Sequence, residues 1–276
     1  MAVTVRAAVK AAGIRVSDLS LEIGGVPILS GISFSAEPGS AVFIVGKNGA
    51  GKSTLLRCVA GMIKNYTGGI YIGGTSAAPM SSRDRARLVA YVPQWSPADV
   101  PYTVFEFMEM SRYPWKPVST DADDRRAAAE AGRLAGIEGL SGRRISSLSG
   151  GERQKVMIAA AIAQETGVIL MDEPTTYLDY AHQVEAMDII TGVNRERGVT
   201  MIVVTHDVNL ALSAAGHVIA LSGGHVLCEG APKDICTPGC LESIYGTGFR
   251  RYIPDSREGH EVLLPIGSER HGARLA

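Results

Sequence analysis

The 276-residue sequence predicts an α/β fold with a mostly parallel sheet, an N-terminal antiparallel β-subdomain and an inserted helical subdomain. Continuous apolar runs at residues 41–45, 168–171 and 200–205 are typical of parallel strands that are buried on both faces. Over residues 14–34 apolar and polar residues alternate, which indicates half-buried antiparallel strands. Between about residues 80 and 165 the apolar spacing becomes that of helices.

The composition is suited to such a fold. Hydrophobic residues make up 46% of the chain and charged residues 20%, which excludes global disorder. The net charge is −1, so bulk charge does not favour binding to a nucleic-acid backbone, and we expect no nucleic-acid partner. The apolar runs are too short to span a bilayer, and no leader-like apolar segment is expected.

The first predicted elements are antiparallel strands around a Gly24-Gly25 turn. Their apolar positions are Ile14, Val16, Leu19, Leu21 and Ile23 before the turn, and Ile28, Ile32 and Phe34 after it. The buried strand at residues 41–45 follows, and then a helix over residues 52–62.

Helical spacing predicts further helices, and turn residues predict two more hairpins. The expected helices cover residues 83–87, 105–110, 123–135, 152–163 and 182–193. The expected hairpins pair residues 217–221 with 225–228, and residues 248–254 with 261–265. We therefore expect one domain over residues 1–250, with the helical subdomain at about 80–165, and a C-terminal hairpin and tail over residues 251–276.

A phosphate-binding loop lies between the first buried strand and the helix that follows it. It matches GxxxxGK[ST] and consists of Gly46, Lys47, Asn48, Gly49, Ala50, Gly51, Lys52 and Ser53, with Thr54 next in the helix. Backbone N–H groups of such a loop, together with the helix N-terminus, bind anionic oxygens. Lys52 is expected to bridge the β- and γ-phosphates of a nucleotide, and the Ser53 hydroxyl to ligate Mg²⁺.

Two acidic residues follow the buried strand at residues 168–171. Asp172 is positioned to hold Mg²⁺, and Glu173 to polarise a water in line with the γ-phosphate. A structural alternative is that one of the two caps the next helix.

A second candidate anion site is the start of the helix near residue 150. Ser149 and Glu152 have the spacing of a capping box, S-x-x-E. Capping does not explain the adjacent Gly150 and Gly151, which cost helix stability. Those glycines suggest a second helix N-terminus that binds phosphate.

The ordered set of motifs resembles that of the ATP-binding subunits of ABC transporters over about residues 14–250. In chain order these are the Walker A loop at 46–53, the Q-loop Gln94, the signature at 148–152, the Walker B segment at 170–174, the D-loop at 177–179 and the switch histidine His206. In the signature, Glu152 replaces the commoner Gln. In place of the aromatic residue that usually stacks on adenine, this chain has Ile23.

The resemblance implies a P-loop NTPase core that binds ATP and Mg²⁺ and acts as a head-to-tail homodimer. Each ATP would lie between the phosphate loop of one chain and Ser149, Gly150 and Gly151 of the other, with Asp179 of the D-loop also at the nucleotide. Gln94 would contact Mg²⁺ and the attacking water. His206 would hold the γ-phosphate from the far side.

Three segments resemble the importers of ferric siderophores and, more loosely, of haem or cobalamin: residues 112–115, 175–183 and 252–265. The implied protein is an importer ATPase at the cytoplasmic face of the inner membrane. Its implied partners are separate transmembrane permease subunits and, through them, a substrate-binding protein. Alternatives are a soluble ABC ATPase of iron–sulfur assembly and a scaffold that binds ATP without hydrolysis.

Two features stay open at this point. Val104, Phe105, Phe107, Met108 and Met110 form an apolar cluster that fits either core packing or docking of a permease helix. The four cysteines, Cys58, Cys228, Cys236 and Cys240, have no familiar zinc spacing, and we expect them to be reduced thiols.

Overall fold

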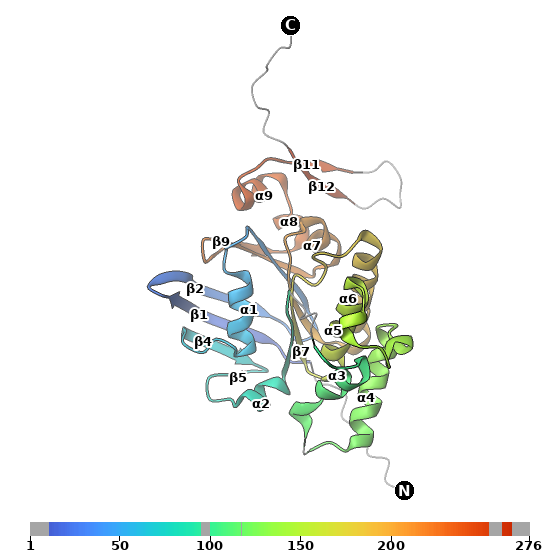
Figure 1. Ribbon diagram of the computed structural model, residues 1–276. Helices are drawn as coiled ribbons and strands as arrows, with labels where there is room; N and C mark the ends of the chain where they lie inside the picture. The colour runs from blue at the N-terminus through green and yellow to red at the C-terminus, as the bar shows by residue number, and fades with distance from the viewer. Residues whose placement is uncertain (1–10, 95–99, 117, 254–260, 267–276) are drawn as a thin grey trace.

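A six-stranded sheet forms the centre of the computed structural model, which describes residues 11–94, 100–116, 118–253 and 261–266 (Figure 1). The strand order is β10-β9-β3-β8-β7-β6. The strands are β3 (Ala41–Gly46), β6 (Val89–Val92), β7 (Val168–Asp172), β8 (Thr200–Val204), β9 (His217–Ser222) and β10 (His225–Gly230). All neighbours pair in parallel except β10 and β9, so the predicted mostly parallel sheet is confirmed.

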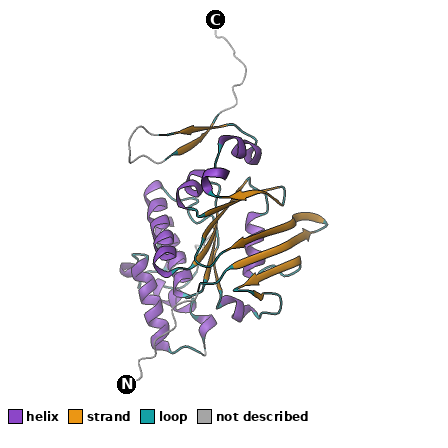
Figure 2. Cartoon of the chain, turned by 180° about the vertical axis from the view of Figure 1, so that it is seen from behind, coloured by secondary structure: helices purple, strands orange, loops and turns teal. Residues whose placement is uncertain are grey.

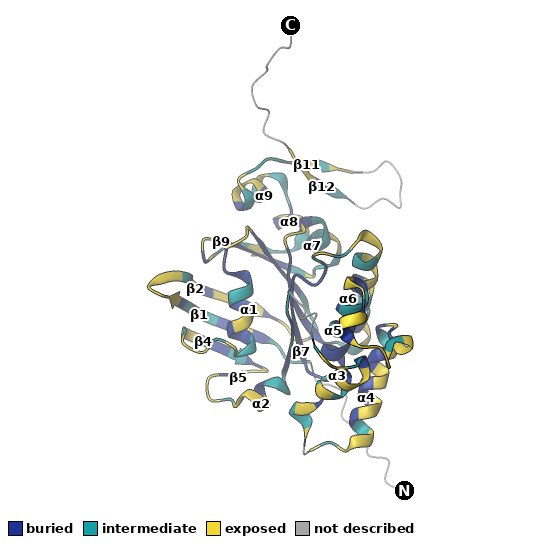
Figure 3. Ribbon diagram, viewed as in Figure 1, coloured by how far each residue is buried: buried dark blue, intermediate teal, exposed yellow. Residues whose placement is uncertain are grey.

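The pleat of the central strand β3 divides the interior into two cores. Phe43 and Val45 face a core that is covered by helices, whereas Val42 and Ile44 face a second core on the other side of the sheet. The first core is covered by α3 (Val104–Met110), α4 (Asp121–Leu134), α5 (Gly150–Ala163) and α6 (Tyr180–Arg197). Figure 3 shows the buried sheet at the centre, with exposed residues along the outer elements.

The second core lies between the central sheet and an antiparallel sheet of order β2-β1-β4-β5 (Figure 2). This sheet contains β1 (Ile14–Ile23), β2 (Val26–Ala36), β4 (Thr67–Ile72) and β5 (Thr75–Ser76). Helix α1 (Lys52–Ala60) contributes Leu55 and Leu56 to the same core. The predicted N-terminal hairpin is therefore confirmed, although β4 and β5 were not expected from a segment that is short and rich in glycine.

The helices between the predicted boundaries agree with the sequence pattern, with one exception. Helix α2 (Ser82–Ala86) and helices α3 to α5 are present, but β6 lies among them and pairs with β7 as the edge of the parallel sheet. Four residues are too few to show a period, which is why β6 is not predicted from the apolar pattern. None of the helices in the described part of the chain is long and apolar enough to cross a membrane.

The C-terminal part of the chain packs onto the first core. The region after β8 contains three short helices that the apolar spacing does not predict: α7 (Val208–Ala214), α8 (Pro232–Ile235) and α9 (Pro238–Tyr245). The expected final hairpin is present as β11 (Phe249–Tyr252) and β12 (Val262–Pro265), while Pro254 and the expected tail beyond residue 266 lie outside the described residues. The side chain of Asn209 bonds to both backbone groups of Leu263, at 3.0 and 2.7 Å.

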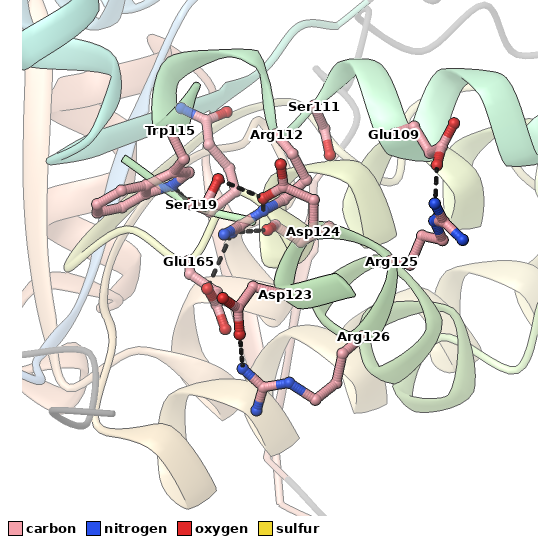
Figure 4. A network of polar contacts seen from close by, with 12 residues as sticks. Glu109, Ser111, Arg112, Trp115, Ser119, Asp123, Asp124, Arg125, Arg126 and Glu165 are labelled. Carbon is pink, nitrogen blue, oxygen red and sulfur yellow. Dashed lines mark hydrogen bonds and ion pairs between the residues drawn. The ribbon is translucent and has the colours of Figure 1, made fainter. Parts of the chain in front are cut away.

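A buried ion network fixes the helical region to the end of α5 (Figure 4). The Arg112 side chain is fully buried and lies 2.9 Å from an oxygen of Asp124 in α4 and 2.9 Å from Glu165 after α5. It also donates to the backbone carbonyl of Ala163, the last residue of α5, at 2.6 Å. Trp115 donates to the next carbonyl, that of Gln164, at 2.6 Å. Both carbonyls are at a helix C-terminus, where intrahelical partners are missing.

We predict that Asp124→Ala lowers the free energy of unfolding by about 3 kcal/mol, because it removes one partner of a buried guanidinium. Glu165 remains beside Arg112, which keeps the loss near the lower end of the range for broken buried ion pairs. Urea unfolding followed by circular dichroism measures this loss.

The matched control is Arg126→Ala in the same helix. It breaks the exposed contact with Asp123 at 3.0 Å and should change the free energy of unfolding by less than about 1 kcal/mol. Equal effects of the two substitutions would contradict an anchoring role of the buried network.

Candidate functional site

A cavity of about 860 Å³ opens at the carboxyl ends of β3, β7 and β8. It is lined by Ile28, Gly46, Lys47, Asn48, Gly49, Gly51, Lys52, Ser53, Thr54, Gln94, Glu173, Thr176, Tyr177, His206 and Tyr245. The structure thus brings together the predicted phosphate loop, Gln94, Glu173 and His206, from segments up to 160 residues apart in the sequence. Ligands bind at this edge in open α/β sheets generally.

The phosphate loop has a shape that requires glycine at two positions. A Cβ on Gly46 would lie 2.2 Å from the backbone oxygen of Leu221 in β9, so no side chain fits there. A Cβ on Gly51 would lie 2.7 Å from the Leu29 side chain, and the φ of Gly51 is +95°. Ala50 is buried behind the loop. These contacts hold the loop against both sheets and leave its inner side open.

Lys52 stands at the centre of this loop. Its ammonium group donates to the backbone oxygens of Gly46 at 2.8 Å and Lys47 at 3.0 Å. Burial lowers the pKa of Lys52, and the nearby carboxylates of Glu173 and Asp172 oppose that effect. A buried ammonium that donates to two carbonyl oxygens and lies near two acids is suited to receive phosphate oxygens.

Both oxygens of Asp172 are held by side-chain donors. Ser53 donates to one at 2.8 Å, and Tyr91 in β6 donates to the other at 3.2 Å. Burial raises the pKa of Asp172, and the two hydrogen bonds oppose this. Within the described residues no group of three or more His, Cys, Asp or Glu side chains could hold a metal ion. The oxygen pair of Ser53 and Asp172 nevertheless fits Mg²⁺, which proteins commonly hold by one or two oxygens together with substrate phosphates.

One carboxylate oxygen of Glu173 is contacted by three side chains. Gln94 donates to its Oε2 atom at 3.0 Å and Thr176 at 2.9 Å, while Nδ1 of His206 lies 3.3 Å away. Glu173 has a φ of +50°, an unusual backbone conformation for a residue with a side chain. Such strain occurs often at functional sites, where the surrounding structure holds it in place.

The second predicted group, at the start of α5, lies outside the cavity: Ser149, Gly150, Gly151 and Asp179 are not among its lining residues. The capping box is confirmed, because Glu152 N donates to the Ser149 hydroxyl at 3.2 Å and Ser149 N to Glu152 at 2.8 Å. Gly150 has no atom within 4 Å of the position of a Cβ.

Gly151 has a packing role that the sequence did not indicate. A Cβ at this position would lie 2.2 Å from the ring of His182 in α6. His182 is in turn fixed by Asp179, which caps α6 by accepting from the His182 backbone N–H at 2.9 Å and contacts its Nδ1 atom at 2.7 Å. These hydrogen bonds lower the pKa of Asp179. The start of α5 and the start of α6 are therefore in direct contact.

Several residues of the site were missed by the sequence analysis. Thr176 lies three residues after Glu173, a spacing at which a hydroxyl reaches back to a turn, and this could have indicated it. Tyr245 and Ile28 line the cavity from distant segments and gave no local signal. Burial raises the pKa of Tyr245 to about 12. Ile23, expected near adenine, is 52% exposed and does not line the cavity.

The chain is similar in sequence to a known protein family and to curated members of it. The family model described as ABC transporter matches residues 29–176. The ferric enterobactin transport ATP-binding protein FepC of Escherichia coli (strain K12) is 35% identical over 260 residues, which cover 93% of this chain and 95% of that protein. The hemin import ATP-binding protein HmuV of Bordetella avium (strain 197N) is 36% identical over 258 residues, covering 91% and 98%.

Solved structures share the fold. A metal-chelate type ABC transporter in an inward-facing conformation aligns with a TM-score of 0.81 at 25% identity and covers 94% of this chain and 98% of its own. A dimeric post-hydrolysis state of the ATP-binding cassette MJ0796, bound to ADP and Pi, aligns with a TM-score of 0.70 at 26% identity, covering 79% and 98%. With this fold, this loop and these relatives, the chain belongs to the ABC transporter family.

Proposed function

We propose that this chain is the ATP-binding and ATP-hydrolysing subunit of an ABC importer for ferric siderophore-type iron chelates. The observation that carries the proposal is the position of Glu173 in the cavity that also contains the phosphate loop. Its carboxylate is held by Gln94 and Thr176, with His206 beside it. This group can take a proton from a water at the far end of a bound triphosphate.

Binding of the triphosphate is assigned to the phosphate loop. Residues 46–54 would surround the β- and γ-phosphates with backbone N–H groups and the N-terminus of α1. Lys52 would exchange its bonds to the loop carbonyls for bonds to phosphate oxygens, which is favourable for a buried ammonium.

Mg²⁺ would be held by Ser53 and Asp172, with Gln94 nearby. When bound, the ion neutralises charge that develops on the phosphate oxygens. Tyr91 keeps the Asp172 carboxylate turned toward Ser53 through its bond to the second oxygen. Tyr91 is therefore a positioning residue for this pair.

Hydrolysis would use Glu173 as general base. The hydrogen bonds from Gln94 and Thr176 fix the carboxylate before a water arrives, which lowers the reorganisation needed during the reaction. His206 lines the cavity beside Glu173 and can donate to the γ-phosphate.

A head-to-tail homodimer would complete the site. The Ser149, Gly150 and Gly151 segment does not reach the cavity of its own chain, yet it exposes the start of α5 with Ser149 at the cap position. A second copy would place this helix start against the nucleotide held by the first. One solved relative of this fold is described as dimeric and bound to ADP and Pi.

The cargo is assigned from the relatives, since the ATPase subunit itself supplies no contact to it. Relatives are named for transport of ferric enterobactin, achromobactin, hemin and iron(3+)-hydroxamate. Haem is therefore the second choice of cargo after siderophores. Cobalamin, and a role in iron–sulfur assembly, rest on the sequence motifs alone and come after it. The expected partners are permease subunits and, through them, a substrate-binding protein, at the cytoplasmic face of the membrane.

The permease would dock on the exposed side of α3. Val104 and Met108 are buried, whereas Phe105 is 46% and Met110 50% exposed. The apolar cluster is therefore divided, with one side in the core and the other side open. Tyr113, 63% exposed, lines the same shallow hollow as Met110, whereas Phe105 lines another. We call these three exposed side chains the α3 face: Phe105, Met110 and Tyr113.

We predict that Glu173→Gln lowers the rate of ATP hydrolysis about 10²- to 10⁴-fold while ATP still binds, because the amide cannot accept the proton. Lys52→Ala is the comparison and should lose ATP binding itself. Steady-state ATPase assays and equilibrium binding of a fluorescent ATP analogue separate the two effects. Full turnover by Glu173→Gln would exclude the base assignment.

We predict that Gly151→Ala lowers the ATPase rate by at least about tenfold, because the new methyl group displaces the start of α5 from the His182 ring. The double variant Gly151→Ala, His182→Ala removes that clash and should recover most of the loss. If the double variant is as slow as Gly151→Ala, then the glycine is needed for another reason, such as the approach of phosphate.

We predict that Phe105→Ser weakens binding to reconstituted permease by about tenfold or more, because an exposed aromatic anchor is lost. Leu227→Ser is the matched control, since Leu227 is 48% exposed on the edge strand β10. Pull-down titrations with permease in nanodiscs measure both. Equal affinity of the two variants would place the docking surface elsewhere.

A further inference from the structure

Three of the four cysteines lie close together at the edge strand β10 and the two helices that cover it. Cys228 lies in β10, Cys236 directly follows the last residue of α8, and Cys240 lies in the first turn of α9. Cys236 is fully buried, while Cys228 and Cys240 are half-buried and so are closer to solvent. Cys58 belongs to the other core, in α1.

The sulfur atoms of Cys228 and Cys240 are in contact, with 3.1 Å between them. Cys228 shares the inner face of β10 with Gly230, and the side chain of Ile235 in α8 lies 3.5 Å from where a Gly230 Cβ would be. That face is thus covered by α8 and α9. A disulfide needs its sulfurs at about 2.05 Å, so an approach of about 1 Å would join them.

We propose that Cys228 and Cys240 are a redox modification site, at which a reversible disulfide ties the edge strand β10 to helix α9. The oxidant is a low-molecular-weight disulfide. One protein thiolate attacks a sulfur of that disulfide and releases one small thiol; the second protein thiolate then attacks the mixed disulfide and releases the other. Two protein thiols are oxidised and one small disulfide is reduced to two thiols.

The surroundings make this site slow to react and stable when reduced. Burial and the adjacent Cys240 thiol raise the pKa of Cys228 to about 12, and burial also raises the pKa of Cys236 to about 11. Few thiolates are therefore present at neutral pH, and the rate of oxidation should rise with pH. Once one thiol has reacted, the contact between the sulfurs favours closure over a second adduct.

Helix α9 connects this pair to the nucleotide cavity. Cys240 lies in its first turn, and Tyr245 at its last residue lines the cavity. Directly after it, a Cβ on Gly246 would come within 3.0 Å of the Lys47 ammonium in the phosphate loop. Opening of α9 away from β10 would expose the half-buried pair further to an external oxidant. On the proposed function, bound ATP restrains that opening and slows oxidation.

The test incubates the full chain with oxidised glutathione, with and without ATP and Mg²⁺, and follows intact mass and peptide maps. We expect a mass lower by two hydrogens, a peptide linking Cys228 to Cys240, and reversal by a reducing dithiol. Cys228→Ser and Cys240→Ser should each stop closure and leave a single glutathione adduct, whereas Cys236→Ala and Cys58→Ala should still close. Two adducts on the unchanged chain, or a link to Cys236, would overturn the site.

The effect of ATP on the rate of disulfide closure is measured separately. ATP should slow closure severalfold in the unchanged chain and have no effect in Lys52→Ala. Closure without any effect of ATP, in a chain that a fluorescent analogue shows to bind nucleotide, would overturn the connection through α9. If the chain bound no nucleotide at all, the proposed function would fail while the disulfide itself would stand.

Discussion

The burial of β3 on both faces is the constraint on which the rest of the structure depends. Because successive side chains alternate, Phe43 and Val45 can only pack against the helices if Val42 and Ile44 pack against α1 and the antiparallel sheet. The strand is then fixed in direction as well as in position. Its carboxyl end becomes the phosphate loop, and at the same edge β7 ends in Asp172 and Glu173 and β8 leads to His206. The site therefore results from the packing of one strand.

Much of this could be predicted from the sequence because the informative signals are local. The run of apolar residues before Gly46, the loop spacing and the two acids after β7 each depend on neighbours within a few residues, and the parallel sheet brings them together. The missed elements lack such signals. Strand β6 is too short to show a period, and β4 contains Gly68 and Gly69. Residues contributed from afar, such as Tyr245 and Tyr91, enter the site only through the tertiary fold.

Gly151 has one role that the sequence motif predicts and another that only the packing shows. The motif predicts that Gly151 belongs to a phosphate-binding helix start, and the structure adds a second requirement, because the His182 ring occupies the place of a side chain. The two explanations are compatible, since one concerns the nucleotide of the proposed partner chain and the other concerns packing within this chain. Because both roles require glycine, the presence of a glycine at position 151 does not by itself distinguish them. Only substitutions that relieve the clash can separate the two.

Helix α5 connects these observations through its two ends. Its start is closed by the capping box of Ser149 and Glu152, and its own last turn carries no basic residue. The charge that favours a helix C-terminus comes instead from Arg112, which bonds to the carbonyl of Ala163. Arg112 lies in the chain between Met110 and Tyr113 of the α3 face, so the end of α5 is tied to the surface proposed for the permease. Between these ends Val156, Ile158 and Ala159 are fully buried. Because a close-packed interior transmits strain, α5 is a physical connection between the surface proposed for the permease and the proposed dimer contact.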